Sequence, residues 1–74
     1  MRKELIGKRL RELREEKGQP KTFVAKQLGI CYRTYCSYEY GERIPGDEAK
    51  VKIADYYGLS VEDIFFTKHN YETR

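Results

Sequence analysis

Residues 23–41 read FVAKQLGICYRTYCSYEYG, and this stretch decides the fold. A helical segment over about residues 21–28 is followed by Gly29 and Ile30, and then by a second, polar and aromatic segment. Ala25 is small enough to let another helix cross closely, Gly29 permits a sharp turn, and Ile30 can fill the gap beneath that turn. The pattern therefore predicts two helices held rigidly across a tight turn, a unit whose second helix can enter a DNA major groove.

Intrinsic propensity disagrees with a helix in the second segment, over about residues 32–40. This segment is rich in Tyr, Cys and Thr, which lean towards strands. However, glycine-terminated helical patterns bracket it, and no other stretch of the chain could pair with it as a strand. We therefore predict a helix, with Tyr35, Tyr38 and Glu39 on its inward side.

A further helix is predicted before this unit, over about residues 3–17. Ile6, Leu10 and Leu13 recur at the spacing of one helical face and form an apolar stripe. Gly18 follows the last apolar position and is a typical helix stop.

A fourth helix is predicted after the turn at residues 43–46, over about residues 47–57. Its first turn is acidic, which is favourable against the helix dipole. We expect Val51, Ala54 and Tyr57 to face inward, with Ile53 on the flank.

The remaining apolar residues fit a fifth, short helix. Ser60 and Asp63 have the spacing of a capping box at its start. The chain thus reads as one all-α domain of five helices over residues 1–66, followed by a polar tail over residues 67–74.

Length and charge restrict the possible functions. The chain has 74 residues, enough for a single domain, and a formal net charge of +3. Residues 1–14 carry six basic and two acidic side chains, whereas residues 47–74 carry four basic and six acidic ones. This asymmetry favours a polyanionic partner, although an ordinary solvated surface of mixed charge explains it equally well.

The cysteine content argues against a secreted scaffold. Cys31 and Cys36 are the only cysteines, and such small scaffolds usually have more, together with a signal peptide. The N-terminus is charged and no long apolar run follows it. We therefore expect a reduced, cytoplasmic protein with no membrane segment.

Metal binding and catalysis are also disfavoured. The spacing of Cys31 and Cys36 fits no compact zinc motif, and the single histidine, His69, lies in the tail. A catalytic cysteine needs a base nearby, and His69 is poorly placed to be one. We expect no metal site, no cofactor and no enzymatic activity.

Over residues 6–65, about four-fifths of the chain, the sequence resembles the Cro/lambda-repressor-type helix-turn-helix family, also called the xenobiotic-response-element family of bacterial and phage regulators. Each matching element is weak alone, but the ordered set at these spacings is specific. The resemblance implies a lambda-repressor-like fold and a transcriptional regulator that binds double-stranded DNA sequence-specifically, as a homodimer on a two-fold operator. The matching residues are Ile6-Gly7, Leu10, Leu13-Arg14, Gly18, Val24-Ala25, Leu28-Gly29-Ile30, Glu39, Gly41, Pro45, Ile53-Ala54, Gly58-Leu59-Ser60 and Ile64-Phe65.

The resemblance makes residues 32–40 the recognition helix. Its early exposed residues would be Tyr32, Arg33 and Ser37, with Cys36 on the fringe. Arg33 is the candidate base reader, because a guanidinium can bond O6 and N7 of guanine together. A phosphate contact or a free solvent charge is an equally good reading of Arg33.

Contacts to the DNA backbone are expected from three residues. Lys21 stands at the start of the second helix, where free amides also attract a phosphate. Arg43 lies in the turn after the recognition helix, with Tyr40 nearby. Such contacts set the register on the duplex and carry no sequence information.

In the family, the positions of Arg14 and Glu39 form a partly buried ion pair that ties the recognition helix to the first helix. A bidentate pair of this kind fixes orientation better than an apolar contact. The alternative is that both residues are ordinary surface charges.

The departures from the family pattern include two in the recognition segment. Cys31 stands where Ser or Thr usually opens the recognition helix, and it is a poorer cap. The recognition segment is also strongly aromatic, and Tyr and Arg are enriched at protein interfaces. The alternative function is therefore a protein-binding module on the same fold, such as an antitoxin-like or accessory regulator.

The dimer surface is open to two interpretations. The exposed part of the fifth helix, with Phe66 and the tail, is one candidate, and Leu5 is a second exposed apolar residue that could contribute. Alternatively, both residues pack within their own chain.

Overall fold

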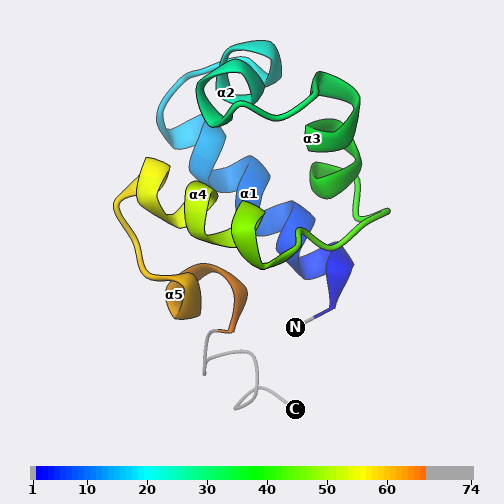
Figure 1. Cartoon of the computed structure of the whole chain (residues 1–74), viewed down its shortest axis with the longest axis vertical. Coiled ribbons are helices and arrows are strands. Elements are labelled where there is room, and N and C mark those ends of the chain that lie inside the picture. Colours follow the sequence, from blue (N-terminus) through cyan, green and yellow to red (C-terminus); the bar gives the residue numbers. More distant parts are fainter. Residues whose placement is uncertain (1, 67–74) are drawn as a thin grey trace.

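The computed structural model describes residues 2–66, which form five helices and, within that range, no strand (Figure 1). The predicted all-α fold is confirmed, and every predicted helix is present to within a residue at the ends for which bounds were given. Met1 and the predicted tail, including His69, lie outside the described residues. The helices are α1 (Lys3–Glu16), α2 (Lys21–Leu28), α3 (Tyr32–Glu39), α4 (Asp47–Tyr57) and α5 (Val61–Phe65).

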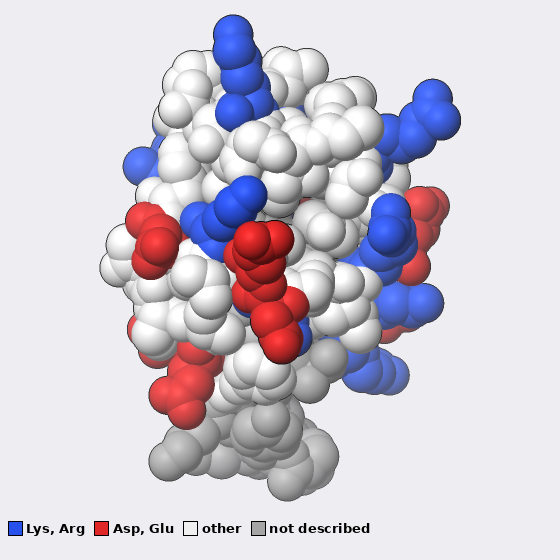
Figure 2. Space-filling view, in the orientation of Figure 1, with Lys and Arg blue, Asp and Glu red and all other residues white. Residues whose placement is uncertain are grey.

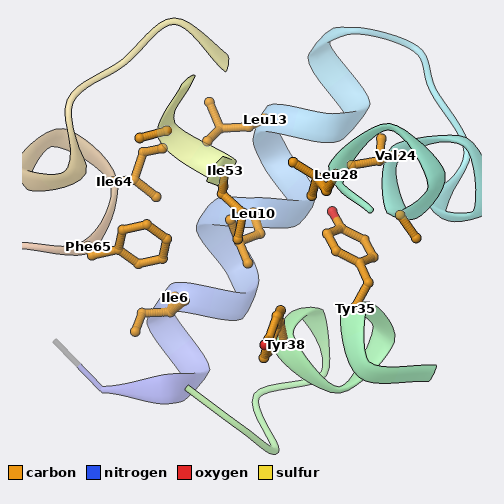
Figure 3. Packing of buried hydrophobic residues seen from close by; sticks show 12 residues of the cluster. Ile6, Leu10, Leu13, Val24, Leu28, Tyr35, Tyr38, Ile53, Ile64 and Phe65 are labelled. Carbon is orange, nitrogen blue, oxygen red and sulfur yellow. The ribbon is translucent and has the colours of Figure 1, made fainter. Parts of the chain in front are cut away.

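Helix α1 runs through the middle of the molecule and carries the core. Ile6, Leu10 and Leu13 are all buried, as their spacing predicts. Along α1, side chains of α4 and α5 pack on one side and those of α2 and α3 on the other (Figure 3). Burying a side chain of this size contributes about 1.5–3 kcal/mol, so the α1 stripe is a main source of stability.

The tight turn between α2 and α3 depends on Gly29. Its φ of 70° lies in the left-handed region, which favours glycine. The amides of Gly29 and Ile30 donate to the carbonyls of Lys26 and Ala25 at 3.1 and 3.0 Å, which closes the end of α2. Ile30 is half-buried beneath the turn and packs against the core, as predicted.

A second close approach brings the end of α3 against the start of α1. Gly7 is buried, and a β-carbon there would overlap the backbone carbonyl oxygen of Glu39. Only a residue without a side chain lets these two backbones meet. The position of α3 relative to α1 is therefore fixed at Gly7 by backbone contact.

The predicted inward face of α4 is confirmed at Ala54 and Tyr57 and wrong at Val51. Val51 is 51% exposed, whereas Ile53, expected on the flank, is fully buried beside Ala54. Ile53 and the half-buried Tyr57 are four residues apart and share a face, while Val51 precedes Ile53 by two residues and so points roughly 200° away.

Helix α5 begins with the predicted capping box. The amide of Asp63 donates to Ser60 Oγ at 3.0 Å, and the amide of Ser60 donates to the Asp63 carboxylate at 3.4 Å. Ile64 and Phe65 then enter the core, and Phe65 is almost fully buried. Among the described helices, none has the length and apolar character needed to cross a membrane.

Candidate nucleic-acid interface

The inner side of α3 is held by a nearly buried carboxylate. Arg14 Nε and Nη2 donate to the two carboxylate oxygens of Glu39 at 2.7 and 3.2 Å, and Arg14 Nη1 donates to the carbonyl of Gln19 at 3.0 Å. The Glu39 side chain is 2% exposed and that of Arg14 13%. The bond to Glu39 raises the pKa of Arg14, so the guanidinium stays charged. The structure thus brings Arg14 and Glu39 together in a bidentate pair.

Tyr35 completes this site with a contact that the sequence did not predict. Its hydroxyl donates to Glu39 Oε2 at 2.5 Å, and the ring is fully buried. Burial, followed by the bond to Glu39, raises the pKa of Tyr35. The four-residue spacing of Tyr35 and Glu39, which places them on one helical face, was the available signal.

The residues of α3 that were predicted to contact DNA bases differ in how exposed they are. Arg33 is exposed, Tyr32 is nearly half exposed and Ser37 is half-buried. Arg33 and Ser37 are four residues apart and therefore share a face. Cys36, expected at the exposed fringe, is instead buried at 8% exposure. An interaction with the Cys36 thiol raises the pKa of Tyr32.

Ser37 ties the following turn to α3. Its hydroxyl donates to the carbonyl of Thr34 at 2.6 Å, and its own carbonyl accepts from the amides of Glu42 and Arg43 at 2.9 and 3.3 Å. Because the hydroxyl hydrogen is engaged, Ser37 can offer a ligand only an acceptor unless this bond breaks. Arg43 remains exposed, on a backbone anchored to α3.

Lys21 and Tyr40 meet across the helix-turn-helix unit. Lys21 Nζ donates to Tyr40 Oη at 3.2 Å and lies 5.0 Å from the centre of the Tyr40 ring. The Tyr40 bond raises the pKa of Lys21. Neither residue was predicted to contact the other, because the contact depends on how α2 and the end of α3 are packed.

The helix N-termini differ in their electrostatics. The first turns of α1, α4 and α5 contain acidic residues, whereas those of α2 and α3, both fully described, contain none. The caps Pro20 and Cys31 also make no side-chain hydrogen bond to their helices. For Cys31 this agrees with the prediction of a poor cap. The amides of Thr34 and Arg33 nevertheless lower the pKa of the exposed Cys31 thiol.

The charged side chains are also distributed unevenly over the surface. In the view of Figure 2, Asp and Glu gather mainly over α4 and α5, while Lys and Arg predominate along the edge where α3 and the start of α1 lie. Within residues 2–66, no cluster of three His, Cys, Asp or Glu side chains could hold a metal ion. Cys31 and Cys36 are both free thiols.

The two candidate dimer residues differ in exposure. Phe66 is 43% exposed, and Lys50 Nζ lies 5.0 Å from the centre of its ring. Leu5, expected to be exposed, is half-buried. It therefore offers less apolar surface than predicted.

Comparisons with known proteins agree with this geometry. The family profile described as a helix-turn-helix domain matches residues 5–64. The chain is 38% identical over 56 residues to the HTH-type transcriptional regulator AnsR of Bacillus subtilis, covering 76% of this chain and 48% of that protein. It is 30% identical over 60 residues to the cryptic phage CTXphi transcriptional repressor RstR of Vibrio cholerae, covering 81% of this chain and 54% of that protein.

The chain thus spans about half the length of these two curated relatives. No solved structure matches it. The matched region contains all of α2, α3 and α4 and the turns between them. The two helices and the tight turn predicted from the sequence therefore lie inside the match. The chain therefore belongs to the helix-turn-helix domain family.

Proposed function

We propose that this chain is the DNA-binding domain of a transcriptional regulator, without enzymatic activity, that reads the major groove with α3. The observation that carries the proposal is the division of α3 into two sides. Its inner side is held by the Arg14–Glu39 pair, and its outer side exposes Arg33. A rigidly held helix with an exposed guanidinium is suited to direct readout. The names of both relatives, a transcriptional regulator and a transcriptional repressor, support this function.

The proposed roles follow from placement. Arg33 is the base reader, with Tyr32 beside it for a thymine methyl or a phosphate and Ser37 as an acceptor. Lys21 and Arg43 are the contacts to the DNA backbone, with Tyr40 next to them. The acid-free first turns of α2 and α3 favour an approaching phosphate further, because the partial positive charge at a helix N-terminus is not neutralised there.

We also propose that the regulator works as a homodimer on a two-fold operator, in the cytoplasm. One recognition helix makes few base contacts, and two units about 34 Å apart along the duplex would double them. The exposed Phe66 at the end of α5 is the main candidate for the dimer surface, and the half-buried Leu5 is a weaker one. Residues 1–66 are the proposed domain and residues 67–74 its tail.

The test is a titration of fluorescent duplexes at two salt concentrations, after selection of a preferred sequence from a random pool. The wild type is expected to bind with an affinity that falls steeply with salt. Arg33→Ala should weaken binding to the selected duplex by about 5- to 150-fold and should affect a random duplex much less. Lys52→Ala on α4 removes the same charge outside the helix-turn-helix unit and serves as the matched control.

A second candidate function is a protein-binding module on the same fold. Large exposed hydrophobic residues concentrate on α2, α3 and the turn after them, namely Phe23, Tyr32, Tyr40 and Ile44. Aromatic residues with Arg nearby are typical of interface hot spots. If the wild type binds no duplex at low salt, this second function replaces the first.

A further inference from the structure

The contact between Lys21 and Tyr40 joins the start of α2 to the end of α3. These residues are nineteen positions apart, and their side chains bridge the two helices on the solvent side at an Nζ–Oη distance of 3.2 Å. The bridge is not part of the core, because Tyr40 is 61% exposed. A structural reason for this bond is therefore weak, since an exposed pair adds little to stability.

We propose that Tyr40 is a positioning residue that holds the Lys21 ammonium ready for a DNA phosphate at the junction of α2 and α3. The proposal rests on the proposed function, and it assigns to Tyr40 an action through Lys21 that a direct phosphate contact would not require.

The hydrogen-bonding capacity of the pair fits this role. A lysine ammonium has three N–H donors, and the bond to Tyr40 uses one of them, so two stay available for phosphate oxygens. The Tyr40 hydroxyl accepts this bond, so its part in the pair is to hold the ammonium while Lys21 presents its two remaining hydrogens to an anion.

The positive charge of Lys21 is also available to an anion. Among the described residues, the one ion pair is that of Arg14 and Glu39, so Lys21 has no carboxylate partner there. The first turn of α2 adds no acidic side chain. A net positive charge therefore remains at the bridge.

Holding the ammonium in place matters because lysine is long and flexible. A free lysine loses rotamer freedom when it binds a phosphate, and that loss weakens binding. The Tyr40 hydroxyl and ring restrict Lys21 before DNA arrives, so part of this ordering is already present in the free protein.

The experiment is a double-mutant cycle on duplex affinity with wild type, Lys21→Ala, Tyr40→Phe and the double variant, measured by fluorescence anisotropy over a range of salt concentrations. Tyr40→Phe keeps the ring and removes only the hydroxyl. We expect it to weaken binding about threefold and to leave the salt slope unchanged, since no charge is lost. Lys21→Ala should weaken binding more and lower the salt slope by about one.

The decisive result is the double variant. If Tyr40 acts through Lys21, adding Tyr40→Phe to Lys21→Ala weakens binding no further. Tyr32→Phe, which removes a hydroxyl not bonded to Lys21, should instead have the same effect with and without Lys21. A Tyr40→Phe effect that persists in the Lys21→Ala background, or no effect in either background, overturns the positioning role.

A measurement on the free protein separates this proposal from the proposed function. Because the Tyr40 bond raises the pKa of Lys21, an NMR titration of the Lys21 side chain should show a lower pKa in Tyr40→Phe. An unchanged Lys21 pKa shows that the bridge is absent and overturns the positioning role alone. Absence of wild-type DNA binding, with the bridge intact by NMR, overturns the proposed function and with it the role of the bridge. Thermal melts of all variants should match the wild type, because both side chains lie at the surface.

Discussion

At the scale of single residues, Glu39 is the side chain whose loss should destabilise the fold most. It accepts from Arg14 and from Tyr35, and it is nearly fully buried. Glu39→Ala would leave the Arg14 guanidinium, itself 13% exposed, and the buried Tyr35 hydroxyl without this partner. We expect a loss of about 3–5 kcal/mol in the free energy of unfolding, measured by urea denaturation.

The exposed Glu42→Ala is the matched control and should change stability by less than about 0.5 kcal/mol. The double variant Arg14→Ala, Glu39→Ala should lose less than the sum of the two single losses, because it leaves no unpaired charge. Strictly additive losses would show that the two side chains do not act as a pair.

The sequence could point to Arg14 and Glu39 through the family resemblance, but not to their other partners. The Tyr35 hydroxyl and the Gln19 carbonyl reach them only after α1 and α3 have packed. The same applies to Lys21 and Tyr40, whose contact could not be predicted from their spacing in the sequence. Charged and aromatic residues could be located from the sequence, whereas their bonds are set by tertiary structure.

At the scale of helices, the crossing of α1 and α3 gives a prediction in which two effects oppose each other. Alanine favours a helix interior over glycine by about 1 kcal/mol, so propensity alone would make Gly7→Ala stabilising. The β-carbon, however, would overlap the carbonyl of Glu39, which is backbone and cannot rotate away. Overpacking typically costs about 1–3 kcal/mol, so we expect a net destabilisation and a lower thermal midpoint.

Lys8→Ala, at the exposed neighbouring position of α1, controls for the effect of alanine on the helix itself. A Gly7→Ala protein that is as stable as this control would mean that α1 and α3 can separate without loss. The contact of α3 with α1 would then be looser than the backbone approach indicates.

The periodicity of apolar residues predicted the buried face of one helix correctly and that of another only in part. Ile6, Leu10 and Leu13 offer one apolar stripe and no competing one, so the face of α1 could be predicted. Helix α4 carries apolar residues on more than one face, and its orientation was decided by packing against α2 and α5. Val51 and Ile53 were therefore assigned to the wrong sides.

At the scale of the whole molecule, α1, α3 and α4 meet around tyrosines rather than around aliphatic side chains alone. The rings of Tyr56 and Tyr57 pack edge to face with centroids 5.0 Å apart, and Tyr57 lies at the inward side of α4 near Tyr35. Among the described residues, the Tyr57 hydroxyl is one of two buried polar side-chain groups without a hydrogen-bond partner. Burial raises the pKa of Tyr57 to about 12.

This shift makes the stability of the whole domain sensitive to alkaline pH. Because the folded state raises the pKa of Tyr57 from about 10 to about 12, it binds the phenol proton more tightly than the unfolded chain does. The stabilisation is therefore complete below about pH 10 and is lost as the pH rises to about 12. In urea denaturation between these pH values, Tyr57→Phe should lose stability less steeply than the wild type, by up to one proton per molecule. Equal slopes in the wild type and Tyr57→Phe would show that Tyr57 is not buried in solution.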